Sequence, residues 1–204
     1  MPEAYPFTGE LPLLLQLHPH VHLTDDEFFA FCQMNRVLHM ERTAEGNILI
    51  LPPAGGDTSG KNSDITHALV HWARKDRTGV VFDSSGGFIL PNTATRSPDA
   101  AWVRRERLAL LSSEQKKKFL PLCPDFVIEL RSPSDRLRNL QDKMQEYLDS
   151  GARLGWLIDP LEKKVHLYEP PDQITILDEP PILKGDPVLE GFVFDLRVIW
   201  EPDF

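Results

Sequence analysis

The sequence has few features of secreted, membrane-bound or disulfide-stabilised proteins. Its 204 residues include two cysteines, Cys32 and Cys123, whose wide separation matches no metal-binding or redox motif. No apolar run approaches the roughly 20 residues needed to cross a bilayer, and the apolar residues 11–15 lack the basic region of a secretory signal. We therefore expect a soluble, cytoplasmic protein with no membrane partner and two buried thiols.

The motifs of several enzyme classes are also missing. The sequence has no glycine-rich phosphate-binding loop and no Gly-x-Ser-x-Gly segment, which argues against P-loop enzymes and the common serine hydrolases. His67 and His71 stand at helical spacing, but the glutamate of a zinc-protease helix is absent between them. His18, His20 and His22 alternate along the sequence and would share one face of an extended arm. They could bind a transition metal there, but an arm that is solvated or packed on the protein is favoured.

Acidic residues outnumber basic ones, which gives a formal net charge of −9. This charge argues against a protein that coats nucleic acid non-specifically, but an enzyme can still bind nucleic acid through a local basic patch. Residues 101–143 contain ten lysines and arginines against six acidic residues. Much of this excess comes from Arg104, Arg105, Arg107 and the run 116–118, for which a solvated loop is the alternative.

The length suffices for one domain with a full core and is short for two. We expect a single domain over residues 1–204, with a proline-rich N-terminal arm (1–23), a core (24–170) and a C-terminal meander on the edge of the sheet (171–204). Strands on both sides of a central helical crossover favour an α/β fold, in which a central mixed β-sheet is flanked by α-helices.

Helices are predicted where a polar cap or helical spacing of apolar residues occurs, and strands where short apolar runs lie between turn residues. The expected helices cover residues 24–34, 62–74 and 135–150, the last capped by Ser134 and ended by Gly151. The expected strands cover 37–41, 47–51, 80–83, 87–90, 100–103, 126–131, 155–158 and 165–168. The strands 80–83 and 87–90 are expected to form a hairpin, and residues 55–60 a loop.

The strand predicted over residues 126–131 carries two charged residues in an apolar setting. Side chains alternate along a strand, so Val127, Glu129 and Arg131 share one face and the residues between them share the other. Burying an unpaired charge costs several kcal/mol. Glu129 and Arg131 are therefore expected to face each other, a cleft or a metal ion, and a simple ion pair between them is the alternative.

Asp99 supplies a second carboxylate at the start of a buried strand, after Pro98. Alone it would be an ordinary strand-start residue. Paired with Glu129 on a neighbouring strand, it becomes a candidate metal ligand, because magnesium uses one or two carboxylates and keeps other positions for water and phosphate. Lys143 lies at the border of the apolar stripe of the helix 135–150 and points either to water or to the same cleft.

The order of these residues carries a resemblance to a known family. It resembles the Uma-type endonucleases of the restriction-endonuclease-like superfamily, whose motif is PD-(D/E)XK. The similarity spans residues 24–170. The core motifs that carry it are Ser97-Pro98-Asp99, residues 124–135 (PDFVIELRSPSD), Lys143, Tyr147, Gly151 and residues 156–160 (WLIDP). The family's N-terminal hairpin is also similar to the segments that contain Glu41, Glu45-Gly46 and Leu51-Pro52-Pro53.

The resemblance implies a restriction-endonuclease-like core and hydrolysis of DNA phosphodiester bonds with Mg²⁺ or Mn²⁺. Asp99, Glu129 and the backbone carbonyl of Leu130 would hold the metal. A bound metal lowers the pKa of a water ligand and offsets charge on the phosphate. Glu41 is a candidate for a further acidic group, with a plain surface residue of the hairpin as the alternative.

Arg131 departs from the motif, because it stands where a lysine is expected. Arginine can bind the phosphate but cannot act as a base, so Lys143 would supply the missing lysine from the helix. A catalytically inactive nuclease-fold protein that binds nucleic acid or a protein partner is therefore the alternative function. A hydrolase of small phosphate esters is a third possibility, less favoured because no closed small-molecule pocket is evident.

Members of the superfamily often act as homodimers, so the resemblance also implies a dimer. Apolar residues of the C-terminal segment could cover a sheet edge or form an interface. These residues are Ile182, Val188, Phe192, Phe194 and Trp200.

Overall fold

A six-stranded mixed sheet forms the centre of the computed structural model, which describes residues 12–202. The strand order is β11-β10-β9-β8-β7-β4, and only the β8–β9 pair is parallel. The strands are β4 (Gly79–Asp83), β7 (Ala100–Arg104), β8 (Phe126–Leu130), β9 (Leu154–Asp159), β10 (Lys164–Glu169) and β11 (Gln173–Asp178). The predicted mixed sheet is confirmed; the parts of the predicted arm and meander at residues 1–11 and 203–204 lie outside the described residues.

Strand β8 is buried on both faces, since each face is covered by helices or a hairpin. Phe126, Ile128 and Leu130 face a cluster formed with α2 (Gly56–Asp76) and the C-terminal elements. Val127 faces the opposite cluster, which includes Met144 and Tyr147 of α4 (Leu137–Asp149). The predicted alternation along this strand is confirmed, and it sends the Glu129 side chain toward Tyr147 of α4.

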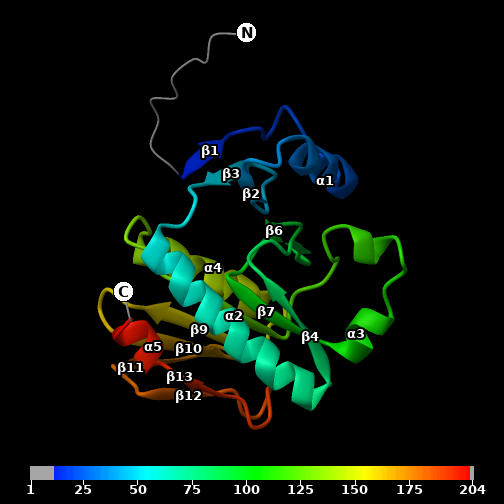
Figure 1. Cartoon of the computed structure of the whole chain (residues 1–204). Coiled ribbons are helices and arrows are strands. Elements are labelled where there is room, and N and C mark those ends of the chain that lie inside the picture. The colour runs from blue at the N-terminus through cyan, green and yellow to red at the C-terminus, as the bar shows by residue number, and fades with distance from the viewer. Residues whose placement is uncertain (1–11, 203–204) are drawn as a thin grey trace.

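A second, five-stranded sheet, the small sheet, lies above one end of the large sheet (Figure 1). Its order is β1 (Leu13–Leu15), β3 (Ile48–Leu51), β2 (His39–Arg42), β6 (Thr95–Arg96) and β5 (Phe88–Ile89). Helix α1 (Asp25–Met34) packs on it through Phe28, and its start is fixed by a capping box between Thr24 and Glu27. The chain passes from β6 of the small sheet into β7 of the large sheet within three residues, which include Asp99.

The predicted hairpin of residues 80–83 and 87–90 is wrong. Strand β4 pairs with β7, and β5 pairs with β6 in the small sheet. After the turn at residues 84–86 the chain leaves the large sheet, because Phe88 is buried beside Leu120, whose carbonyl accepts the Ile89 N–H. Pairing was therefore decided by contacts distant in sequence rather than by the turn.

Three other boundaries differ from the sequence prediction. The loop expected at 55–60 starts helix α2, where Thr58 and Lys61 are buried. Helix α4 begins at Leu137 rather than 135, because the Asp135 carboxylate accepts the Ser132 N–H. The C-terminal segment does not lie only on the sheet edge: β12 (Ile182–Lys184), β13 (Val193–Asp195) and α5 (Arg197–Trp200) cover the α2 face of the large sheet.

Two short helical segments, α3 (Arg105–Ala109) and the 3₁₀ turn η1 (Gln115–Lys117), connect β7 to β8. Among residues 12–202, no helix combines the length and the apolar character needed to cross a membrane.

Candidate active site

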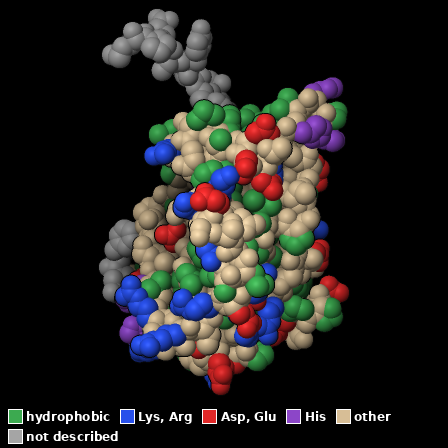
Figure 2. Space-filling view, turned by 90° about the vertical axis from the view of Figure 1, so that its right-hand side faces the viewer, with side chains coloured by type: hydrophobic (Ala, Val, Ile, Leu, Met, Phe, Trp, Pro, Cys, Tyr) green, Lys and Arg blue, Asp and Glu red, His purple; other side chains and the backbone are tan. Residues whose placement is uncertain are grey.

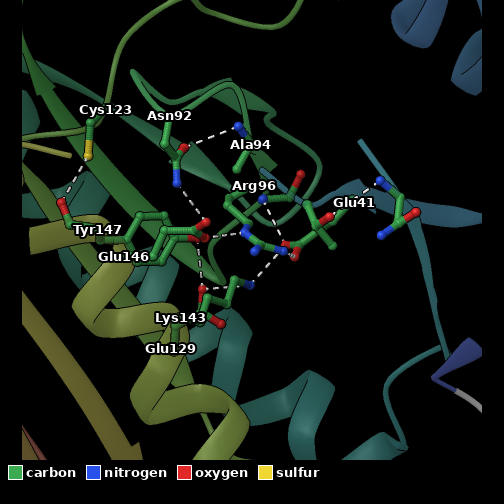
Figure 3. Close-up of polar contacts among 12 residues, drawn as sticks. Glu41, Asn92, Ala94, Arg96, Cys123, Glu129, Lys143, Glu146 and Tyr147 are labelled. Atoms are coloured by element: carbon green, nitrogen blue, oxygen red, sulfur yellow. Dashed lines mark hydrogen bonds and ion pairs between the residues drawn. The ribbon is translucent and has the colours of Figure 1, made fainter. Parts of the chain in front are cut away.

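Four of the predicted site residues come together where the small sheet meets the large sheet. Glu41 comes from β2, Asp99 from the link into β7, Glu129 from β8 and Lys143 from α4. Figure 3 shows the side chains of Glu41, Glu129 and Lys143 directed toward one another. Residues separated by about 100 positions thus form one charged cluster, which we call the acidic cluster (Glu41, Asp99, Glu129, Lys143).

Lys143 binds two carboxylates that are almost inaccessible to solvent. Its Nζ lies 2.9 Å from Glu41 Oε1 and 2.8 Å from Glu129 Oε1. The exposed fractions of Glu41 and Glu129 are 1% and 4%. The Lys143 side chain therefore points into the site rather than to water, which decides between the two orientations considered from the sequence.

The two glutamates titrate in opposite directions. Burial raises the pKa of Glu129 to about 8; Lys143 opposes this shift, while Asp99 and Glu41 add to it. Burial would also raise the pKa of Glu41, but Lys143, Arg96 and the Ser97 N–H lower it to about 2. Burial lowers the pKa of Lys143, yet Glu129 and Glu41 outweigh it and keep the net shift upward. At neutral pH Glu41 is charged and Glu129 is mostly protonated, so a metal ion bound by Glu129 would have to displace its proton.

Asp99 is held by two hydrogen bonds. Its Oδ2 accepts the Leu130 N–H at 2.8 Å, and its Oδ1 accepts Asn62 Nδ2 at 2.9 Å. The N–H and C=O of one strand residue point to the same side of the strand, so the bond also directs the Leu130 carbonyl toward Asp99. Burial raises the pKa of Asp99, and the Leu130 N–H opposes that shift.

The oxygen donors at Asp99 fit a magnesium or manganese ion. Asn62 Oδ1 is buried and accepts no hydrogen bond among the described residues, an arrangement that costs about 1–3 kcal/mol. A cation beside Asp99 would give this amide oxygen a partner. Residues 12–202 contain no group of three or more His, Cys, Asp or Glu side chains able to share a metal. A metal here would therefore use two carboxylates with amide and backbone oxygens and water, a set that suits Mg²⁺.

Arg131 does not join the acidic cluster. Its NH1 atom lies 2.7 Å from Oδ2 of Asp159, a fully buried residue of β9, and its Nε donates to the Asp135 carbonyl at 3.4 Å. The ion pair with Glu129 that was considered from the sequence is wrong. The guanidinium instead holds the end of β9 against the end of β8.

Several contacts in the site were not predicted from the sequence, although Tyr147 is one of the residues that carry the resemblance. Arg96 donates to Glu41 at 3.1 Å and also pairs with Glu146, and Tyr147 OH donates to Glu129 at 3.1 Å (Figure 3). Glu146 and Tyr147 follow Lys143 by three and four positions on α4, so helical spacing could have suggested them. Arg96 is 55 residues from Glu41, and no local pattern marks such a contact.

A cavity of about 740 Å³ opens beside the cluster. One wall is the small sheet, which contributes Leu14 and Leu49, and the other is the start of α4, which contributes Asn139. Glu41 and Lys143 lie on its lining. A substrate could therefore reach Lys143 from solvent through this cavity.

Comparisons with known proteins identify the family and the fold. The sequence profile of the Uma2 family, described as "Putative restriction endonuclease", matches residues 25–197. A crystal structure from Anabaena variabilis ATCC 29413, described as a "putative nuclease belonging to DUF820", has a TM-score of 0.72 and 21% sequence identity. The alignment covers 87% of this chain and 97% of that chain, which shows that the two share a fold. No curated protein matches this chain. Since the profile extends over most of the sequence, the resemblance seen in the motifs is confirmed, and the chain belongs to the Uma2 family of restriction-endonuclease-like proteins.

Proposed function

We propose that this protein is an endonuclease that hydrolyses DNA phosphodiester bonds with Mg²⁺ or Mn²⁺. The observation that supports this most directly is the acidic cluster, in which two buried glutamates from β2 and β8 bind one lysine and Asp99, in the link before β7, lies close to Glu129. The family description and the fold of the Anabaena nuclease point to the same class of reaction.

Asp99, Glu129 and the Leu130 carbonyl are the proposed metal ligands, with the Asn62 amide oxygen beside them. When bound, the metal would lower the pKa of a water ligand and stabilise negative charge on the phosphate. Glu129 must lose its proton to act as a ligand, and its raised pKa makes metal binding compete with that proton.

Lys143 is proposed to act as a fixed positive charge at a phosphate oxygen. Two carboxylates raise its pKa, so it stays protonated near neutral pH and is a poor general base. Glu41 positions Lys143, and Glu41 is in turn held by the Ser97 N–H at 2.9 Å and by Arg96. Lys143, held by these contacts, would take the role of the lysine that is missing at position 131. A contact of Arg131 with the phosphate stays a prediction, as do the homodimer and the cytoplasmic location.

One observation favours the alternative of an inactive nuclease-fold protein. The guanidinium at the motif's lysine position is bound to Asp159, so the strand itself offers no free cation to a phosphate. Under this alternative the protein would bind nucleic acid or a protein partner through the same fold.

Cleavage of supercoiled plasmid separates the two functions. Wild type is compared with Asp99→Asn, Glu129→Gln and Lys143→Met in Mg²⁺, in Mn²⁺ and in EDTA, and Asp178→Asn, an exposed acid on β11, is the control. We expect cleavage only with metal, a loss of about 100-fold or more in each cluster variant, and no change in the control. DNA binding by wild type without cleavage in either metal would support the inactive alternative.

A further inference from the structure

Four cations without an ionic partner gather at one end of helix α2. Thirteen of the 22 lysines and arginines form an ion pair within the described residues, as expected in a chain with 31 acidic residues. Of the nine that do not, four lie together and form what we call the α2–β4 basic patch. They are Arg74, Lys75, Arg77 and Arg105.

The patch surrounds a shallow pocket that no acidic side chain lines. The pocket has a volume of about 440 Å³, and Arg74, Arg77 and Arg105 border it together with Val70, Ala73 and the first residues of β4. In Figure 2, lysine and arginine side chains gather on the lower part of the face, where Figure 1 places the end of α2 and the start of β4.

Arg105 is fixed in a geometry that leaves donors free. Its Nε donates to the Arg77 carbonyl at 3.1 Å, and its NH2 donates to the Gly79 carbonyl at 3.4 Å. A guanidinium carries five N–H donors, so three of them remain for a ligand. A partly immobilised guanidinium loses less entropy when it binds a phosphate through two hydrogen bonds.

Local structure explains only part of the patch. Arg74 and Lys75 occupy the last turn of α2, where cations are favoured by the helix dipole. Arg77 has φ of 63°, a left-handed conformation that usually favours glycine. Arg105 is the first residue of α3, where the dipole disfavours a cation. Two of the four residues are thus placed against local preference.

We propose that the α2–β4 basic patch binds the phosphate backbone of duplex DNA, beyond the segment that enters the active site. This inference rests on the proposed function. A protein with a net charge of −9 repels DNA on average, so it needs a local positive surface to hold the substrate near the acidic cluster. The phosphates of a duplex offer several anions at once, which matches the three guanidinium groups of Arg74, Arg77 and Arg105 around one pocket.

Strand β7 connects the patch to the active site. Asp99 directly precedes this strand and Arg105 directly follows it. Six residues of extended chain span about 20 Å, a length that about six base pairs of duplex cover. The patch therefore lies at the other end of β7 from Asp99, beside the edge strand β4 of the large sheet.

The test measures binding of the full-length protein to a fluorescent 20-base-pair duplex in EDTA over a range of salt concentrations. The patch variant is Arg74→Gln/Arg77→Gln/Arg105→Gln. The control variant is Lys163→Gln/Lys164→Gln/Lys184→Gln, which removes the same charge from exposed residues near β10 and on β12. Arg74→Glu, a single change at an exposed helical residue, serves if the triple variant does not fold.

We expect the patch variant to bind at least tenfold more weakly near 0.1 M salt, with the slope of log affinity against log salt reduced by about 2–3. The control variant should stay within about twofold of wild type. The inference would be overturned if both triple variants weakened DNA binding equally, or if neither weakened it. It would also be overturned if the patch bound polyglutamate more tightly than DNA, because the patch would then favour an acidic protein. If wild type cleaves DNA and the patch variant binds DNA as tightly as wild type, this inference fails and the proposed function stands. If wild type neither binds nor cleaves any duplex, with or without metal, the proposed function fails as well.

Discussion

The affinity of the site for Mg²⁺ should rise steeply with pH, because Glu129 must be ionised to act as a ligand. Its carboxyl group is 4% exposed, and burial raises its pKa to about 8. Glu41, with a pKa of about 2, and Lys143, with its pKa raised above the ordinary value, do not titrate between pH 6.5 and 8.5. Glu129 therefore dominates the linkage between protons and metal in this range.

The size of the increase in Mg²⁺ affinity follows from the ionised fraction of Glu129. With a pKa of about 8, roughly 3% of the carboxyl groups are ionised at pH 6.5 and roughly 76% at pH 8.5. The apparent Mg²⁺ affinity should increase about 25-fold between these values and level off above pH 8.5. Binding at pH 6.5 should also release about one proton. The affinity rises rather than falls with pH because the pKa of the Glu129 carboxyl group is raised, and this favours the protonated, metal-free form at low pH.

Isothermal titration calorimetry at both pH values, in two buffers of different ionisation enthalpy, measures affinity and proton release together. Glu129→Gln, which keeps the shape and removes the titration, should lose most of the binding and the proton release. An affinity that is the same at pH 6.5 and 8.5, or proton release that persists in Glu129→Gln, would refute this account of the site.

Three further predictions concern stability and reactivity. Lys143→Met removes the cation that binds both Glu41 and Glu129 and leaves Glu41 with Arg96 alone, so we expect a loss of about 3–5 kcal/mol in urea unfolding, whereas Arg138→Met, which breaks an exposed pair on the same helix, should cost less than about 1 kcal/mol. Gly79→Ala would place a Cβ 2.2 Å from the ring of Trp102, which is 1% exposed, so we expect thermal unfolding to show a loss of about 1–3 kcal/mol. Gly55→Ala has nothing within 4 Å of its Cβ but changes the N-cap of α2, so it should cost less than about 1 kcal/mol. Burial raises the pKa of Cys123 to about 12, so alkylation at pH 8 should be at least 100-fold slower in the folded protein than in urea; equal rates in both states would show that the thiol is accessible.

The central strand and the two carboxylates of Glu129 and Asp99 could be predicted from the sequence because their signals are local. Alternation along residues 126–131 placed Glu129 on the face opposite Ile128, and the structure confirms that arrangement. Pro98 and Asp99 before an apolar run marked the other carboxylate. Periodicity on α4 limited Lys143 to two orientations, and the structure decided between them through contacts with Glu41 and Glu129.

The remaining features depend on contacts that no short pattern contains. Arg131 has a carboxylate two residues away at Glu129, yet it pairs with Asp159, because the parallel β8–β9 pairing sets those strand ends side by side. Arg96 reaches Glu41 only because β6 and β2 lie in one sheet. The false hairpin at 80–90 has the same origin, since a turn can end a strand without returning the chain to it.

The link between the two sheets affects when the site becomes complete. Lys143 needs Glu129 of the large sheet and Glu41 of the small sheet, and the two sheets are joined at Asp99. A newly made chain whose small sheet has not yet docked would lack one of the two carboxylates that orient the lysine. The proposed hydrolysis would then begin only after the small sheet has docked on the large sheet.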